Sequence, residues 1–193
     1  MDTKLQAKDL IRVGVFTAIY FVIFFATGLV GYIPILFVML PVIMPIVTGI
    51  PFMLFVTKVK KFGMITIMAL LLGFLMFATG HTWVPVVTAG ICGLLGDLIF
   101  KAGKYRRFRN TVLGYGVFSV WSMGAMLPMW LMRDSYFEYI RSSAGDEYAN
   151  AVGALTPSWV AFVIIAVAFV AGIAGAYLGK AVLRKHFQRA GIV

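Results

Sequence analysis

The chain has 193 residues, of which 62% are hydrophobic and 12% are charged. Soluble domains carry about 25% charged residues, so this composition excludes a soluble globular domain and indicates an integral membrane protein. The net charge of +10 does not indicate nucleic-acid binding, because the basic residues lie in short turns between apolar runs. The single cysteine, Cys92, excludes a disulfide within the chain and a cysteine cluster for a metal.

The first third of the chain predicts two membrane-spanning helices. About 20 apolar residues span a bilayer as a helix, and residues 9–27 form the first such run. Gly28, Gly31 and Pro34 interrupt the pattern, so we expect an irregular outer portion over residues 28–40. The second helix continues to residue 57, and its interior prolines predict a kink.

Four further spans are predicted in the rest of the chain. The third covers residues 63–78 and the fourth residues 82–100, with a tight outer turn between them. The fifth covers residues 111–132 and the sixth residues 157–183. A polar outer segment, residues 133–156, separates these last two, and within it Gly145 divides two short amphipathic helices that we expect at the membrane surface.

The basic residues predict the orientation of these spans. The loop over residues 101–109 holds five basic residues and no acidic one, and Lys and Arg favour the cytoplasmic side. With this loop inside, Arg133 and Arg141 are the only two of the seventeen basic residues that lie outside. We therefore expect one domain over residues 1–193, an all-α compact bundle of six transmembrane helices with both termini cytoplasmic and residues 133–156 extracellular.

The sequence does not indicate an enzyme. Nucleophilic catalysis needs a nucleophile and a base within hydrogen-bond reach, and a metal site needs three or four ligands. His81 and Asp97 are separated by sixteen residues of one predicted helix, which corresponds to about 24 Å. No catalytic residues, metal site or cofactor are therefore expected.

Asp97 is the one acidic residue placed within a predicted span. Ionisable residues inside a membrane are candidates for function. Lys101 follows four residues later, in the favourable order for a helical ion pair. We expect a structural or coupling role for Asp97 and Lys101 rather than transport chemistry.

Small residues recur at four-residue spacing and predict close helix packing. In the sixth span they indicate packing inside the bundle. In the first span Gly14 and Ala18 could instead receive a helix of a partner protein. A methionine stripe on the fifth span, Met123, Met126, Met129 and Met132, predicts apolar packing, with a ligand wall as the alternative.

Polar and aromatic residues gather at the predicted outer ends of three helices. An aromatic belt at the membrane surface explains each tryptophan singly. Together these helix ends could also close around one small polar or aromatic solute, with Arg133 as an anion anchor. The candidate substrate-binding residues are His81, Trp83, Trp130, Arg133, Tyr136 and Trp159.

Several blocks of the sequence resemble the Trep_Strep family of bacterial membrane proteins. They are KDLIRVGVFTAIYF, IPFMLFVTKVKKFGM, GHTWVP, GLLGDLIFKAGKY, LMRDSYFEY, LTPSW and KHFQRAGIV, and they cover essentially the whole chain. The family is classed among the substrate-binding S components of energy-coupling factor (ECF) transporters. The resemblance implies a six-helix protein of the bacterial cytoplasmic membrane that captures a vitamin-like or other small micronutrient outside the cell.

The resemblance also implies partners. S components join a transmembrane T protein and two cytoplasmic ATPases, which supply ATP hydrolysis and drive toppling of the S component in the lipid. Docking in these proteins uses a small-xxx-small motif on the first helix, usually AxxxA, and Gly14 and Ala18 match this motif in size. The proline-rich segment over residues 28–45 could act as a gate over the pocket.

We expect an S component, with three competing hypotheses. A self-sufficient small carrier or channel would transport solute without ATP or partners. An intramembrane enzyme would show turnover that is lost when one residue is changed. A membrane scaffold would bind no small molecule.

Overall fold

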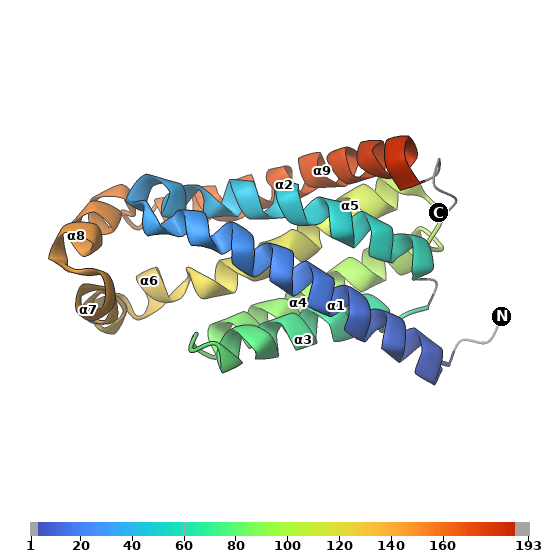
Figure 1. The fold of residues 1–193 in the computed structure, drawn as a ribbon, viewed down its shortest axis with the longest axis horizontal. Coiled ribbons are helices and arrows are strands. Elements are labelled where there is room, and N and C mark those ends of the chain that lie inside the picture. Colours follow the sequence, from blue (N-terminus) through green and yellow to red (C-terminus); the bar gives the residue numbers. More distant parts are fainter. Residues whose placement is uncertain (1–3, 60, 188–193) are drawn as a thin grey trace.

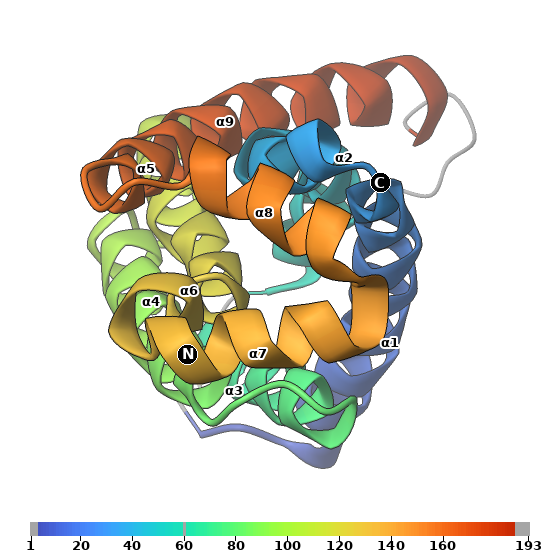
Figure 2. The same cartoon turned by 90° about the vertical axis from the view of Figure 1, so that its left-hand side faces the viewer.

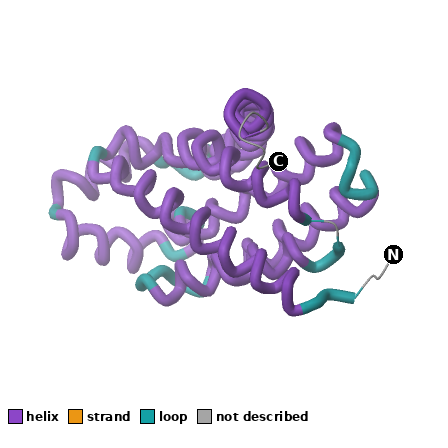
Figure 3. Tube along the Cα trace, turned by 45° about the vertical axis from the view of Figure 1, so that its right-hand side comes forward, coloured by secondary structure: helices purple, strands orange, loops and turns teal. Residues whose placement is uncertain are grey.

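The computed structural model describes residues 4–59 and 61–187, with side chains described as far as Lys185. Within these residues every regular element is a helix (Figure 3). Six helices run along the long axis of the molecule (Figure 1): α1 (Ala7–Gly28), α2 (Pro34–Lys58), α3 (Met64–Ala78), α4 (Val84–Ala102), α5 (Phe108–Ser119) and α9 (Val160–Val182). The long apolar runs of the sequence have therefore formed a lengthwise helical bundle.

These six helices form a closed ring of contacts. Helix α1 packs on α2 and α3, α2 packs on α9, α9 on α5, α5 on α4, and α4 on α3. Aromatic side chains fill the centre, where the ring of Phe52 lies 4.4 Å from that of Phe118 and 4.5 Å from that of Tyr115. Ring pairs at this spacing add attraction to the burial of their apolar area, so they hold the middle of the bundle together.

In the part of the chain that the structure describes, four helices are long and apolar enough to cross a membrane, namely α1, α2, α4 and α9. Helix α3 is apolar but has only 15 residues. The predicted fifth span is not one continuous helix. The long spans establish a protein that crosses the membrane several times, whereas the sidedness of the termini remains a prediction.

The second span begins earlier than the sequence predicts. Only the short 3₁₀ turn η1 (Leu29–Tyr32) and Ile33 lie between α1 and α2, and α2 starts at Pro34 instead of after residue 40. A proline in the first helical turn is tolerated because its missing N–H would lack a partner there anyway. Helix α2 continues through its interior prolines, Pro41, Pro45 and Pro51. The Tyr115 phenol of α5 donates to the Pro45 carbonyl at 2.7 Å, which ties α2 to α5 at this level.

The expectation of one continuous helix over residues 111–132 is wrong. Helix α5 ends at Ser119, a 3₁₀ segment η2 covers Val120–Ala125, and a short α6 covers Pro128–Leu131. Pro128 cannot donate the helical hydrogen bond at its position. In addition, Thr88 of α4 donates to the carbonyl of Trp121 at 3.0 Å, which stabilises the tightened backbone.

Small residues bring α2 and α9 into backbone contact. A Cβ atom added to Gly175 would lie 2.2 Å from the Pro45 carbonyl oxygen, and one added to Gly49 would lie 2.4 Å from the Gly175 oxygen. No side chain fits at such distances, so glycine is required at both positions. The expectation that the small residues of the sixth span pack inside the bundle is confirmed.

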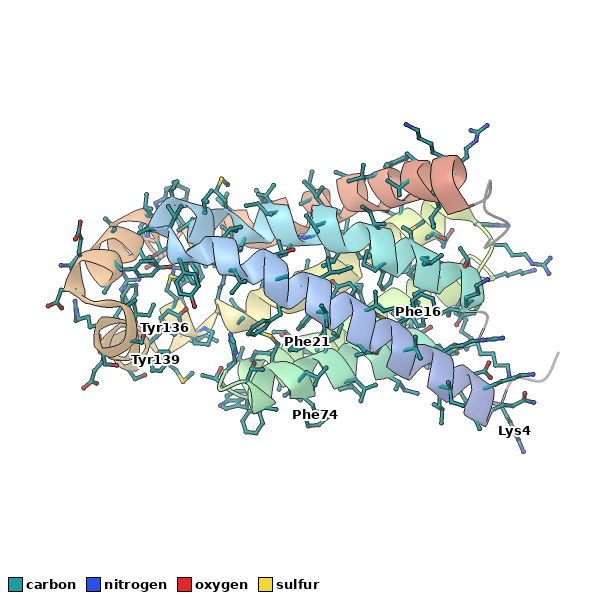
Figure 4. The ribbon with its side chains drawn as sticks, in the orientation of Figure 1. Lys4, Phe16, Phe21, Phe74, Tyr136 and Tyr139 are labelled. Carbon is teal, nitrogen blue, oxygen red and sulfur yellow. The ribbon has the colours of Figure 1, made fainter. Side chains whose placement is uncertain are left out.

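The two ends of the bundle differ in charge. The start of α1 and the end of α9 lie at the same end, together with the basic loop that follows α4 (Figure 1). Lys4 lies at this end, opposite Tyr136 and Tyr139 (Figure 4). Lys60 and Arg189, which the sequence also places inside, fall outside the described residues.

Two short helices lie across the other end of the bundle (Figure 2). They are α7 (Arg133–Ala144) and α8 (Asp146–Leu155), and both fall in the predicted outer segment. Gly145 joins them with a φ of 89°, a conformation that glycine adopts without steric cost. The helices α7 and α8 pack on each other, so together they form a helical hairpin over the end of the bundle.

Candidate functional site

A cavity of about 870 Å³ lies at the end of the bundle that the α7–α8 hairpin covers. Its wall is formed by the end of α1, η1, the start of α2, the turn between α3 and α4, η2, and the hairpin itself. This volume is in the range of pockets that hold small molecules. The cavity is therefore the candidate functional site.

Helix α7 turns one face to the cavity. The lining residues from this helix recur at helical spacing and are Ser135, Tyr136, Tyr139, Ile140, Ser143 and Ala144. The labelled Tyr136 and Tyr139 both belong to this face (Figure 4). The charged residues of α7 are exposed and do not line the cavity: Arg133, Asp134, Glu138 and Arg141.

A hydrogen bond and a ring contact join α8 to η1 and to the start of α2. The phenol of Tyr148 donates a short hydrogen bond to the Gly31 carbonyl in η1. Its ring meets that of Phe37 edge-on, with 6.3 Å between the ring centroids. Burial raises the pKa of the Tyr148 phenol, so the group is neutral at pH 7 and keeps the proton it donates.

His81 lines the cavity from the turn between α3 and α4. Its Nδ1 lies 3.3 Å from Thr79 Oγ1, and Thr79 itself donates to the Met76 carbonyl at 2.8 Å. Because the Thr79 hydrogen is committed, we assign the Nδ1–H tautomer, which leaves Nε2 as an acceptor. Burial lowers the pKa of His81, so its neutral form predominates at pH 7.

One polar atom of the lining has no partner. Thr82 lines the cavity, and its Oγ1 is buried without a hydrogen bond among the described residues. Buried hydroxyl groups are normally paired, so an unpaired one beside a cavity is a place where a bound molecule could supply the missing partner.

The cavity floor rests on a buried polar network. Phe24 lines the cavity, and its ring lies 5.0 Å from the Trp121 ring. Beneath them, Thr48 Oγ1 lies 3.0 Å from the hydroxyl of Tyr20 and 3.1 Å from that of Tyr115. Each of these polar groups has a partner, so the network gives the floor a single arrangement.

The structure places two of the six candidate binding residues along the cavity, His81 and Tyr136. The side chains of Trp83 and Trp159 are 61% and 65% exposed, and neither lines the cavity. Their positions match the aromatic-belt interpretation of exposed tryptophans at helix ends.

Trp130 and Arg133 hold the hairpin instead of facing the cavity. Trp130 Nε1 donates to the Pro157 carbonyl at 3.2 Å, and Arg133 donates to the Thr156 carbonyl at 3.1 Å. The Arg133 guanidinium also lies over the Phe137 ring, 4.9 Å from its centroid. Both side chains therefore tie the start of the hairpin to its end.

Asp97 lies at the basic end of the bundle, far from the cavity lining. The side chain is fully buried and accepts hydrogen bonds from the Gly63 N–H at 2.7 Å, the Thr66 hydroxyl at 3.1 Å and the Tyr105 phenol at 3.1 Å. It thereby caps the start of α3. Among the described residues Asp97 makes no ion pair with Lys101, whose Nζ lies 4.9 Å from the Phe62 ring centroid.

Gly14 and Ala18 lie on an exposed face of α1. A Cβ atom added to Gly14 would meet nothing within 4 Å. These small residues are therefore not required for packing inside the bundle, in contrast to the glycines of α9.

The sequence interpretation missed most of the lining. Tyr139, Ser135 and Ser143 could have been found from the spacing of hydroxyl and aromatic residues opposite the charges of α7. Met123, Met126 and Met132 line the cavity, whereas packing was the preferred interpretation of that stripe. Phe24 of α1 and Met44 of α2 also line the cavity, and no pattern in the sequence around them marks them as lining residues.

Among the described residues no three His, Cys, Asp or Glu side chains come together as metal ligands would.

A family model described as "Hypothetical bacterial integral membrane protein (Trep_Strep)" matches residues 7–189. The match covers nearly the whole chain, including every element of the cavity wall. Comparisons with curated proteins and with solved structures gave no match. The resemblance drawn from the sequence blocks is thus confirmed at the level of the family, and the helical fold with several long apolar spans agrees with it. The chain belongs to the Trep_Strep family of bacterial integral membrane proteins.

Proposed function

We propose that this protein is the solute-binding subunit, or S component, of an ECF-type importer in the bacterial cytoplasmic membrane. The observation that carries the proposal is the cavity of about 870 Å³ at one end of a membrane-spanning bundle. The charge distribution predicts that this end faces outward. A solute-binding subunit needs such a pocket on the side from which its solute arrives.

A second feature supports the need for partners. Small residues on a spanning helix allow another helix to approach closely, and Gly14 and Ala18 have no neighbour inside the chain that requires them. We assign this face of α1 to the T protein of the importer. Two ATPases bound to the T protein would then provide the ATP hydrolysis, and this chain would need no catalytic residue of its own.

Co-purification tests the assignment. The chain is co-expressed with the T protein and ATPases of the same bacterium, and the complex is captured through a tag on one ATPase. Gly14→Leu and Ala18→Leu should lower the yield of complex at least tenfold, because the larger side chain separates the two helices. The matched control is Ala166→Leu, an alanine of α9 that is also exposed, which should leave the yield unchanged.

The competing function is a self-sufficient carrier or channel. Uptake into vesicles that contain only this protein would support that alternative and contradict the S-component proposal. Equal yields of complex for Ala18→Leu and Ala166→Leu would keep the importer but remove α1 as its docking face.

A further inference from the structure

We propose that the cavity binds an uncharged, planar aromatic molecule whose edge carries N–H or O–H donors. The inference rests on the proposed function, because it names the class of solute that the S component would capture. Four features of the cavity wall carry it: the absence of charge, the aromatic surface, the state of the hydroxyl groups, and the size.

The cavity wall offers no counter-charge to an ionic solute. None of the described residues that line it is Asp, Glu, Lys or Arg. An ion buried without a partner costs several kcal/mol, so a binding site for a carboxylate or phosphate normally contains a basic side chain.

The basic residues of α7 are engaged elsewhere. Arg133 donates to the carbonyls of Thr156 and Gly153, and the exposed Arg141 lies 3.7 Å from the exposed Asp146. Helix α7 thus separates its charged face from its cavity face. This separation is what a neutral solute requires.

The histidine of the lining does not supply the missing charge. Burial lowers the pKa of His81, and its immediate partner is the neutral hydroxyl of Thr79 rather than a carboxylate. At pH 7 the ring is therefore an uncharged acceptor through Nε2.

Aromatic rings and thioethers make up much of the wall. The aromatic residues are Phe24, Phe25, Tyr32, Phe37, Tyr136, Tyr139 and Tyr148. Methionines from α2, α3 and η2 add adaptable, polarisable surface between them. Ring faces pair best with other rings, so a flat conjugated molecule gains more from this wall than an aliphatic one of equal area.

The serine hydroxyls of the wall donate their hydrogens to the protein backbone. Ser122 donates to the Ser119 carbonyl at 3.0 Å, Ser143 to the Tyr139 carbonyl at 2.9 Å, and Ser135 to the Met132 carbonyl at 3.2 Å. The lone pairs of these serines remain as acceptors, and His81 Nε2 adds another. The unpaired Thr82 hydroxyl and the phenols of Tyr136 and Tyr139 can either donate or accept. A solute that brings N–H or O–H donors complements these acceptors.

The volume sets the size of the molecule. About 870 Å³ is more than a single small ring needs and suits a fused or substituted ring system. A solute of this size would reach from the hydroxyls near the hairpin to the aromatic floor at Phe24.

The experiment is capture from a complex mixture. The protein in lipid nanodiscs is equilibrated with an aqueous yeast extract, washed, and denatured, and the released small molecules are measured by mass spectrometry. Empty nanodiscs are the blank. The expected result is enrichment of at least tenfold over the blank for compounds that are aromatic and carry no net charge at pH 7.

Two variants on adjacent residues of α7 sharpen the result. Ser143 lines the cavity and Ser142 does not, and both are exposed hydroxyls that donate to the Tyr139 carbonyl. Ser143→Asp should reduce retention about tenfold, because a carboxylate at the wall must be desolvated by a neutral solute. Ser142→Asp should keep retention within about twofold of the parent protein, since its charge stays in water.

The outcomes separate this inference from the proposed function. Retention of a carboxylate, a phosphate ester, a cation or a lipid chain would overturn the inference and leave a binding protein in place. Equal retention by Ser142→Asp and Ser143→Asp would also overturn it, because the wall would then tolerate charge. A protein that retains nothing above the blank would contradict the proposed function, and the inference would fail with it.

Discussion

At the scale of single residues, the hydrogen bonds of buried polar groups hold neighbouring elements of this chain together. Asp97 illustrates the principle, since it is fully buried, and its hydrogen bonds join α3, α4 and the basic loop. The sequence identified Asp97 as the one acidic residue within a span but paired it with Lys101. The actual partners, Gly63, Thr66 and Tyr105, are backbone and hydroxyl groups that a charge pattern does not reveal.

Replacing Asp97 should therefore destabilise the protein, whereas replacing Lys101 should not. Asp97→Asn puts an amide N–H₂ where several donors converge, and we expect a loss of about 2–3 kcal/mol in the free energy of unfolding. Lys101→Met should change it by less than about 0.5 kcal/mol, as is usual for an exposed side chain. Thermal unfolding in detergent measures both. Equal effects of the two substitutions would favour the ion pair that the sequence suggests.

His81 should make stability depend on pH. Its pKa is lowered by burial, so the folded state binds the proton less readily than the unfolded state does. Above the unfolded pKa of about 6.5 both states are neutral and His81 adds no penalty. The loss of stability develops as pH falls from that value to the lowered pKa of the folded state, and it is constant below it. We expect the melting temperature to drop between pH 7.5 and pH 5 by more in the parent protein than in His81→Gln. An identical drop in both would show that His81 does not titrate in this range.

At the scale of elements, small residues have two separate uses. In α9 they admit α2 to backbone contact, whereas on α1 they face away from the bundle. Spacing alone does not separate these uses, because both helices repeat small residues every four positions. The same limit applies to the fifth span, where hydropathy predicted one helix and the contact with Thr88 and the position of Pro128 broke it.

Alanine substitutions distinguish the two uses of glycine. Gly175→Ala should lower the free energy of unfolding by about 1–3 kcal/mol, because the new methyl group would overlap the Pro45 carbonyl oxygen. Gly14→Ala should raise it by about 0.5–1 kcal/mol, because alanine favours a helix and meets no neighbour in the chain. Chemical denaturation in mixed micelles compares them directly. A destabilised Gly14→Ala would mean that the α1 face is already used inside the protein.

Arg133 should stabilise the α7–α8 hairpin rather than bind the solute. Arg133→Met removes the donors to the Thr156 and Gly153 carbonyls, and we expect faster amide hydrogen exchange across α7 and α8. Arg141→Met is the control, because Arg141 and its partner Asp146 are both exposed and such pairs contribute little. Unchanged exchange in Arg133→Met would leave Arg133 available as the anion anchor that the sequence suggests.

At the scale of the whole molecule, most of the architecture follows from hydropathy and charge, and the cavity does not. Runs of apolar residues predicted the helices, and glycine at position 145 correctly divided the outer segment into two. The cavity is built from the ends of helices that are distant in sequence, such as Phe24 on α1, Met44 on α2 and Tyr139 on α7. Which helix ends meet depends on the closed ring of packing contacts, and no local pattern encodes that ring.

The central claim is that this chain binds a solute and depends on partners and ATP to deliver it. The most direct test compares vesicles containing the chain alone with vesicles that also contain the T protein and both ATPases. Vesicles with ATP at the ATPase side are exposed to yeast extract at the opposite side, and their contents are analysed by mass spectrometry. The account predicts that an uncharged aromatic compound accumulates only in the complete vesicles with ATP. Accumulation of the same compound in vesicles with the chain alone would contradict it.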